Sequence, residues 1–127
     1  MADYPIRIRT GIEDRVISEA RRSAKDNLSN PAVAREVHLE VHLSNTIKEL
    51  SDLLLSKHRD YGPKNISQAP GGPINGLRVR MHDKLARISN LVDSGADPQH
   101  ESLEDSFKDM ANYAIIGLLV LRGQWDN

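Results

Sequence analysis

Apolar residues recur every three or four positions over most of the chain, which is the periodicity of amphipathic helices. In residues 11–27, one face carries Ile12, Val16, Ala20 and Ala24, each four positions from the next. Residues this far apart lie above one another on a helix. We therefore expect a first helix over this segment.

Turn and cap residues indicate the structure of the segments on either side of this helix. Within residues 1–10, Ile6 and Ile8 alternate with Arg7 and Arg9, as in an extended arm or edge strand. Asn30 is a good N-cap, and Pro31 suits a first helical turn. Helical periodicity then runs over residues 32–57, although residues 37–43 also alternate strictly, so a short strand there is an alternative. We favour a continuous helix because both flanks are helical and no turn residues intervene.

The second half of the chain has two further helical segments. Residues 61–76 are rich in Gly and Pro, and we expect a long loop. A third helix is predicted over residues 77–92, ended by Gly95, and a last helix from the N-cap Ser102 to about Leu121. The pattern predicts an all-α fold, a bundle of about four helices completed by oligomerisation.

Length and composition fit a single domain of 127 residues, with an arm and first helix in residues 1–30 and a helical domain in residues 31–127. The net charge of −1 provides no basic field for a polynucleotide. There is no cysteine, which excludes disulfides and thiolate chemistry. The most apolar run, residues 114–121, is too short to span a membrane. We expect a cytoplasmic protein with neither a membrane nor a polynucleotide as partner.

The last predicted helix has an unusual distribution of charge. Its apolar stripe consists of Leu103, Phe107, Met110, Ala114, Leu118 and Leu121. Asp105, Asp109 and Asn112 lie roughly opposite, yet that side continues into Ile116 and Val120, so the second half is apolar all round. The acidic residues should then face an enclosed space, where a divalent metal would balance their charge. The alternative is that Asp105 caps the helix while Asp109 forms a surface ion pair.

The third predicted helix carries a basic face. Its core side is predicted to hold Met81, Leu85 and Ile88. Another side groups Arg80, Asp83, Lys84 and Arg87. Three cations around one carboxylate suit a polyphosphate, because Arg forks onto phosphate oxygens and Lys supplies a point charge. Ion pairing with neighbouring acidic helices explains the same residues equally well.

The second predicted helix holds two pairs of polar residues with helical spacing. Glu49 and Asp52 are neighbours at i, i+3, and an exposed charged face is their ordinary explanation. His38 and His42 have the i, i+4 spacing of metal ligands, but no third ligand follows at a recognisable spacing. We interpret the histidine pair as structural.

Three segments share a pattern that goes beyond helical periodicity: residues 57–65 (KHRDYGPKN), 80–87 (RMHDKLAR) and 101–114 (ESLEDSFKDMANYA). Together they resemble a known family, the phage and bacterial nucleotide modification associated domain. The resemblance covers about residues 45–122. This domain is in turn similar to the MazG and dimeric dUTPase family of all-α nucleotide pyrophosphohydrolases.

The wider resemblance implies a helical oligomer, a homodimer or homotetramer, that binds Mg²⁺ and cleaves a nucleoside triphosphate to the monophosphate and pyrophosphate. Glu49 and Asp52 resemble the first acidic pair of that family, and Asp105 and Asp109 correspond to the second. Ser106 stands where the wider family has a Glu. The implied metal ligands are thus these four carboxylates.

The resemblance also implies roles for the other polar residues of the three segments. The catalytic residues would be Asp105, Asp109 and Lys84. The residues implied to bind the substrate are Lys57, Asp60, Tyr61, Lys64, Asn65, Arg80, Asp83, Arg87 and Asn112. The leading hypothesis is therefore a Mg²⁺-dependent hydrolase acting on a nucleotide. The alternatives are a non-catalytic nucleotide-binding or sequestering protein and, from a third class, a helical adaptor without a small ligand.

Overall fold

The computed structural model describes residues 11–126, and in this range every regular element is a helix. In chain order they are α1 (Gly11–Leu28), α2 (Pro31–Tyr61), α3 (Lys64–Ser67), α4 (Pro73–Ser94) and α5 (Leu103–Leu121). The predicted all-α class is confirmed, and the alternative strand at residues 37–43 is wrong, because α2 continues through it. The arm or strand expected for residues 1–10 lies outside the described residues. None of the described helices is long and apolar enough to cross a membrane.

The helix ends follow the local signals in the sequence. Asn30 caps α2 by accepting a hydrogen bond from the backbone N–H of Ala32 at 3.0 Å. At the start of α5, the Ser102 hydroxyl accepts from the backbone N–H of Asp105 at 3.0 Å, and the Asp105 carboxylate accepts from that of Ser102 at 3.2 Å. Gly95 ends α4 with a φ of 63°, a conformation that glycine adopts without steric cost.

The segment expected to be one long loop is shorter than predicted. It contains α3, and α4 begins at Pro73, four residues before the predicted start of the third helix. Proline is compatible with the first turn of a helix, where its missing N–H is not needed. The turn of α3 is held by Ile66, which is buried in the core. The Gly and Pro content of this segment predicted a loop. Its helical turn therefore depends on tertiary contact with the core.

The chain divides into two units, residues 1–45 and 46–127. The described part of the first unit consists of α1 and the beginning of α2, and most of its side chains are exposed. The apolar Ile12, Val16 and Leu39 are among them. This unit therefore forms no buried core of its own within residues 11–45.

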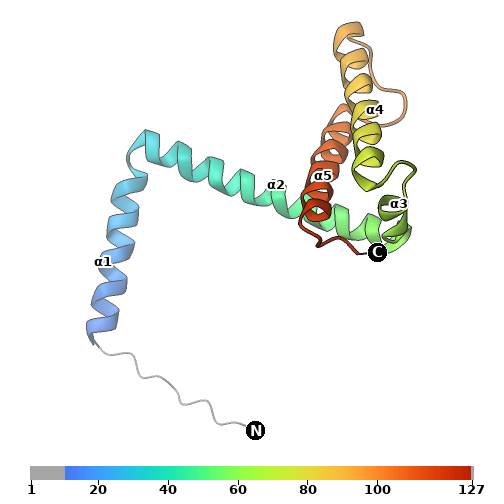
Figure 1. The fold of residues 1–127 in the computed structure, drawn as a ribbon. Coiled ribbons are helices and arrows are strands. Elements are labelled where there is room, and N and C mark those ends of the chain that lie inside the picture. The colour runs from blue at the N-terminus through green and yellow to red at the C-terminus, as the bar shows by residue number, and fades with distance from the viewer. Residues whose placement is uncertain (1–10, 127) are drawn as a thin grey trace. The chain divides into compact units, whose positions relative to one another are not determined.

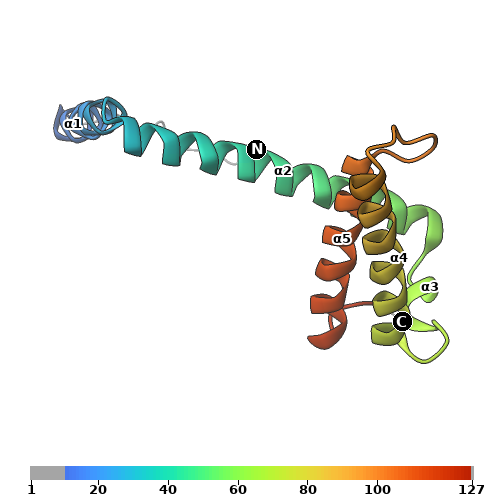
Figure 2. The same ribbon diagram turned by 90° about the horizontal axis from the view of Figure 1, so that it is seen from above.

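The second unit contains the core and the end of α2 together with α3, α4 and α5. Figures 1 and 2 both show α4 and α5 side by side and antiparallel, with α3 beside the start of α4. The centre of the core consists of Ile66, Leu77 and Ile116. Against it pack the partly buried side chains of Leu54, Tyr113, Val120 and Trp125. These contacts join all four helices and the segment after α5.

The buried side of α5 is its polar side. Its buried residues are Ser106, Asp109, Asn112 and Ile116. Members of the apolar stripe are exposed instead, with Phe107 at 56% and Leu118 at 50%. The prediction that Asp109 and Asn112 face an enclosed space is therefore confirmed, whereas Asp105 is exposed at the helix start.

The buried side of α4 combines apolar and basic residues. Leu77 and Ile88 are buried, and Arg80, Lys84 and Arg87 are half-buried along the same side. Leu85, predicted to face the core, is 52% exposed. The prediction for Leu85 is wrong because α4 meets the polar side of α5, so cations rather than a third aliphatic side chain fill this part of the interface.

Candidate functional site

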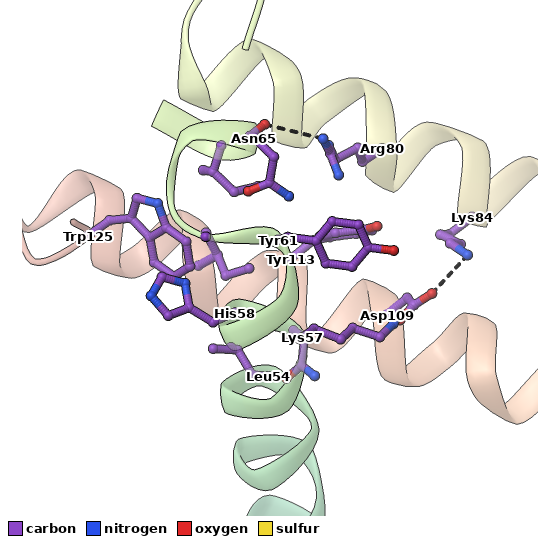
Figure 3. A pocket seen from close by; sticks show the side chains of 14 residues that line it. Leu54, Lys57, His58, Tyr61, Asn65, Arg80, Lys84, Asp109, Tyr113 and Trp125 are labelled. Carbon is purple, nitrogen blue, oxygen red and sulfur yellow. Dashed lines mark hydrogen bonds and ion pairs between the residues drawn. The ribbon is translucent and has the colours of Figure 1, made fainter. Parts of the chain in front are cut away.

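A cavity of about 300 Å³ lies in the second unit, with walls from α2, α3, α4, α5 and the segment after α5. Figure 3 shows it with charged side chains at one end and the rings of His58 and Trp125 at the other. The residues that line it are Leu54, Lys57, His58, Tyr61, Gly62, Asn65, Ile66, Arg80, Lys84, Asp109, Asn112, Tyr113, Ile116 and Trp125. The cavity thus combines cations, a carboxylate, amides and aromatic rings.

The charged end is built around Asp109 of α5. One carboxylate oxygen lies 2.7 Å from the ammonium of Lys57 on α2, and the other lies 2.8 Å from that of Lys84 on α4. Asp109 is only 8% exposed, so its charge requires such partners. The ion pairs position both ammonium groups at the cavity wall.

The same contacts determine the protonation of the three groups. Burial alone would raise the pKa of Asp109, but hydrogen bonds from Lys57 and Lys84 outweigh it and hold the pKa below its usual range. The hydrogen bond to Asp109 raises the pKa of Lys57. Burial tends to lower the pKa of Lys84, yet hydrogen bonds to Asp109 and Glu101 leave it raised. All three groups are therefore charged near neutral pH.

Behind the cavity wall, Lys84 is also held by Glu101. Its ammonium lies 2.8 Å from both oxygens of that carboxylate, which precedes α5. Arg87 follows on α4 and donates to the backbone carbonyl of Glu101 and, at 2.7 Å, to the hydroxyl of Ser106. Ser106 has no exposed surface. Around Lys84 and Arg87, the side of α4 that faces α5 thus forms a network of charged and polar contacts.

Trp125 forms the opposite end of the cavity. Its indole N–H donates to the carbonyl of Pro63 at 3.2 Å, which fixes the segment after α5 near the end of α2. The ring meets that of His58 edge to face at 5.1 Å. The imidazole Nε2 of His58 lies 3.7 Å from the carboxylate of Asp126. These contacts close the aromatic end.

Arg80, Tyr113 and Tyr61 lie between the two ends (Figure 3). The Arg80 guanidinium is 6.0 Å from the centre of the Tyr113 ring and donates to the backbone carbonyl of Asn65 at 3.2 Å. Tyr61 is 69% exposed although it lines the cavity. Its ring is therefore accessible to a planar ligand.

The structure brings together about half of the residues implied by the resemblance. The cavity is lined by Lys57, Tyr61, Asn65, Arg80, Lys84, Asp109 and Asn112. Outside its lining are Glu49, Asp52, Asp60, Lys64, Asp83, Arg87 and Asp105. Of this second group, Arg87 is held by the interface of α4 and α5, and the other six are exposed at other positions. The ion-pair alternative considered for the third helix is borne out for Lys84, which nevertheless also lines the cavity.

The four carboxylates implied as Mg²⁺ ligands each have a partner of their own. Glu49 pairs with Lys108, and Asp52 pairs with Lys48 at 2.6 Å. Asp105 belongs to the capping box of α5, and its hydrogen bonds to Ser102 hold its pKa below the usual range. Within residues 11–126, no three His, Asp or Glu side chains form a group that could hold a metal ion. The carboxylates as placed do not fit a single metal site, and Mg²⁺ binding remains a prediction.

Several site residues were not found by sequence reasoning. Trp125 is the single tryptophan of the chain, and that rarity was the available signal. His58 lies within the first of the three segments but had no motif to identify it. Glu101 and Ser106 belong to no periodic pattern in the sequence. Their role comes from hydrogen bonds with Lys84 and Arg87, which lie on another helix.

The geometry defines an all-α domain with a mixed charged and aromatic cavity. A family model described as nucleotide modification associated domain 1 matches residues 57–121, just over half of the chain. The chain belongs to this family. All lining residues except Leu54 and Trp125 fall in the matched range. The curated proteins and the solved structures gave no match.

Proposed function

We propose that the cavity is a nucleotide-binding site, with the phosphate at its charged end and the base at its aromatic end. The observation that carries the proposal is the pairing of Lys57 and Lys84 around Asp109 at one end, with aromatic rings at the other. The association of the family with nucleotide modification agrees with this ligand class.

The phosphate end relies on cations that are already in position. Asp109 holds both ammonium groups, so a phosphate would gain their charge without first ordering two flexible side chains. Lys57 is half exposed and has donors that remain available to a ligand. Arg80, which also lines the cavity, can fork onto phosphate oxygens.

The base end relies on stacking. Aromatic side chains bind bases with little sequence preference, because every base has a π face. The exposed ring of Tyr61 and the rings of Tyr113 and Trp125 are available along the cavity. The amides of Asn65 and Asn112 supply polar groups near them. Asn112 donates to the carbonyl of Leu50 at 3.2 Å, which orients its amide.

A second candidate is Mg²⁺-dependent hydrolysis of a nucleoside triphosphate to the monophosphate and pyrophosphate. It is favoured by Asp109, a buried carboxylate at the charged end of the cavity. Mg²⁺ in nucleotide sites is often held by one or two carboxylates together with substrate phosphates. Against it, Lys57 and Lys84 already neutralise Asp109.

Titration of the full chain with nucleotides tests both candidates. Trp125 is the only tryptophan and lines the cavity, so its fluorescence should change on binding. The panel comprises the mono- and triphosphates of each base, with and without Mg²⁺, and pyrophosphate release is followed in parallel. Saturable binding without Mg²⁺ and without release supports a binding protein. Mg²⁺-dependent release supports the hydrolase, and the absence of binding by any nucleotide contradicts both.

A further inference from the structure

We infer that the cavity selects a nucleoside 5′-monophosphate over the corresponding triphosphate. This inference rests on the proposed nucleotide site and specifies its substrate class. It is drawn from the charge of the lining, the carboxylates around Lys84 and the size of the cavity.

The first argument is the charge balance of the lining. The ionised side chains are the cations Lys57, Arg80 and Lys84 and the single anion Asp109, a surplus of two positive charges. Outside the lining, the Glu101 carboxylate binds Lys84 and lowers the positive charge available there, so the surplus is at most two charges. A phosphate monoester carries about −1.5 to −2 near neutral pH, which matches this surplus. A triphosphate carries about twice as much and would leave its excess uncompensated.

The second argument is the position of acidic groups at the charged end. The Lys84 ammonium lies 2.8 Å from Asp109 and 2.8 Å from both carboxylate oxygens of Glu101. Lys84 is only 20% exposed, so most of its surface is already covered by protein. One phosphate can reach the ammonium of Lys57, whose side chain is half exposed, beside that of Lys84. Further phosphates would approach the carboxylates themselves, and like charges at short range repel.

The third argument is size. At about 300 Å³ the cavity lies at the lower end of the range for small-ligand sites. A base and sugar along the aromatic part leave room for one phosphate at the charged end. The two further phosphates of a triphosphate would have to leave the cavity. A monophosphate therefore matches the site in charge and in length.

The test is a titration of the full chain with the mono-, di- and triphosphate of one nucleoside, at fixed ionic strength and without divalent metal. The base is the one bound best in the panel, and Trp125 fluorescence reports binding. We expect the dissociation constant to rise along the series, with the monophosphate at least tenfold tighter than the triphosphate. Equal or tighter binding of the triphosphate overturns the inference but leaves the nucleotide site intact. If no member binds, the proposed function itself fails.

A charge variant tests the physical cause. Glu101→Gln removes one of the two carboxylates at Lys84, so the preference for the monophosphate should shrink severalfold. Glu104→Gln is the matched control, because its exposed carboxylate pairs with Lys108 and does not line the cavity. A preference unchanged in Glu101→Gln, or equally reduced in both variants, contradicts the proposed role of the Glu101 carboxylate.

Discussion

Lys84 on α4 and Asp109 on α5 form an ion pair with 2.8 Å between the ammonium and a carboxylate oxygen. The same carboxylate also binds Lys57 on α2, so one buried residue connects three helices. The contacts that shape the charged end of the cavity are therefore also contacts that hold the second unit together. A substitution at Asp109 must be examined for its effect on folding as well as on binding.

Asp109→Asn should lower the free energy of unfolding by about 1.5–3 kcal/mol, because hydrogen bonds between charged groups are replaced by weaker ones. The change leaves Lys57 without its counter-charge and leaves Lys84 with Glu101 as its remaining carboxylate partner. Urea denaturation followed by circular dichroism measures the loss. Asp52→Asn is the matched control, since its pair with Lys48 is exposed and contributes little to stability. Equal effects of the two variants would contradict the structural role of Asp109.

The stability of the wild-type chain should fall in acid partly through Asp109. Its pKa is lower in the folded protein than the ordinary value of 3.8, so its contribution is present above that pH. The contribution is lost as the pH falls below 3.8 and through the lowered folded value. Urea titrations from neutral pH into acid should therefore show a shallower loss of stability for Asp109→Asn than for wild type. Parallel curves for the two chains would refute this assignment.

Lys57→Gln should weaken nucleotide binding about tenfold or more, because one charge-assisted hydrogen bond to the phosphate contributes about 1.5–3 kcal/mol. Lys64→Gln is the control. The resemblance implied Lys64 as a substrate ligand, but this residue is exposed and does not line the cavity. The affinity of the Lys64→Gln variant for the nucleotide should stay within about twofold of the wild-type affinity. Fluorescence titration compares the two, and a larger loss in Lys64→Gln would show that the phosphate lies elsewhere.

The exposed apolar stripe of α5 should be covered by a second copy of the chain. Phe107, Leu118 and Leu121 are 56%, 50% and 73% exposed, and they share one side of the helix. Exposed apolar residues that follow one face of a helix indicate an association surface. Leu118→Glu should therefore shift the protein towards monomer in light scattering at micromolar concentration. Ser89→Glu, at an exposed position of α4, should not. A wild-type chain that is monomeric under these conditions contradicts the prediction of a homodimer or homotetramer.

The positions of the long helices were predictable from the sequence because their signals are local. The apolar spacing in residues 11–27 predicted α1 to within one residue at its end. Ser102 and Asp105 lie close in the chain and satisfy backbone groups at the start of α5, so a short motif contains the whole interaction. The exception is α3, a single turn whose Ile66 is held by the core rather than by local preference.

The candidate site was predictable only in part. The resemblance identified Lys57, Lys84 and Asp109, and the structure places all three at the charged end of the cavity. It also implied Glu49 and Asp52 as partners of Asp109 in a metal site, but these carboxylates pair with Lys108 and Lys48. The spacing of residues along one helix shows which of them share a face. It does not show which other helix packs against that face.

By itself, the sequence determined the all-α class, the approximate positions of the long helices and the residues that share each helix face. Only the tertiary structure decided which faces are buried. On α5 the line through Ser106, Asp109 and Asn112 is inside, while the apolar stripe through Phe107 and Leu118 is exposed. The reason is that Lys57 and Lys84 compensate the buried charge of Asp109 from other helices. Such compensation depends on residues far apart in the chain, and it exists only once the helices have packed together.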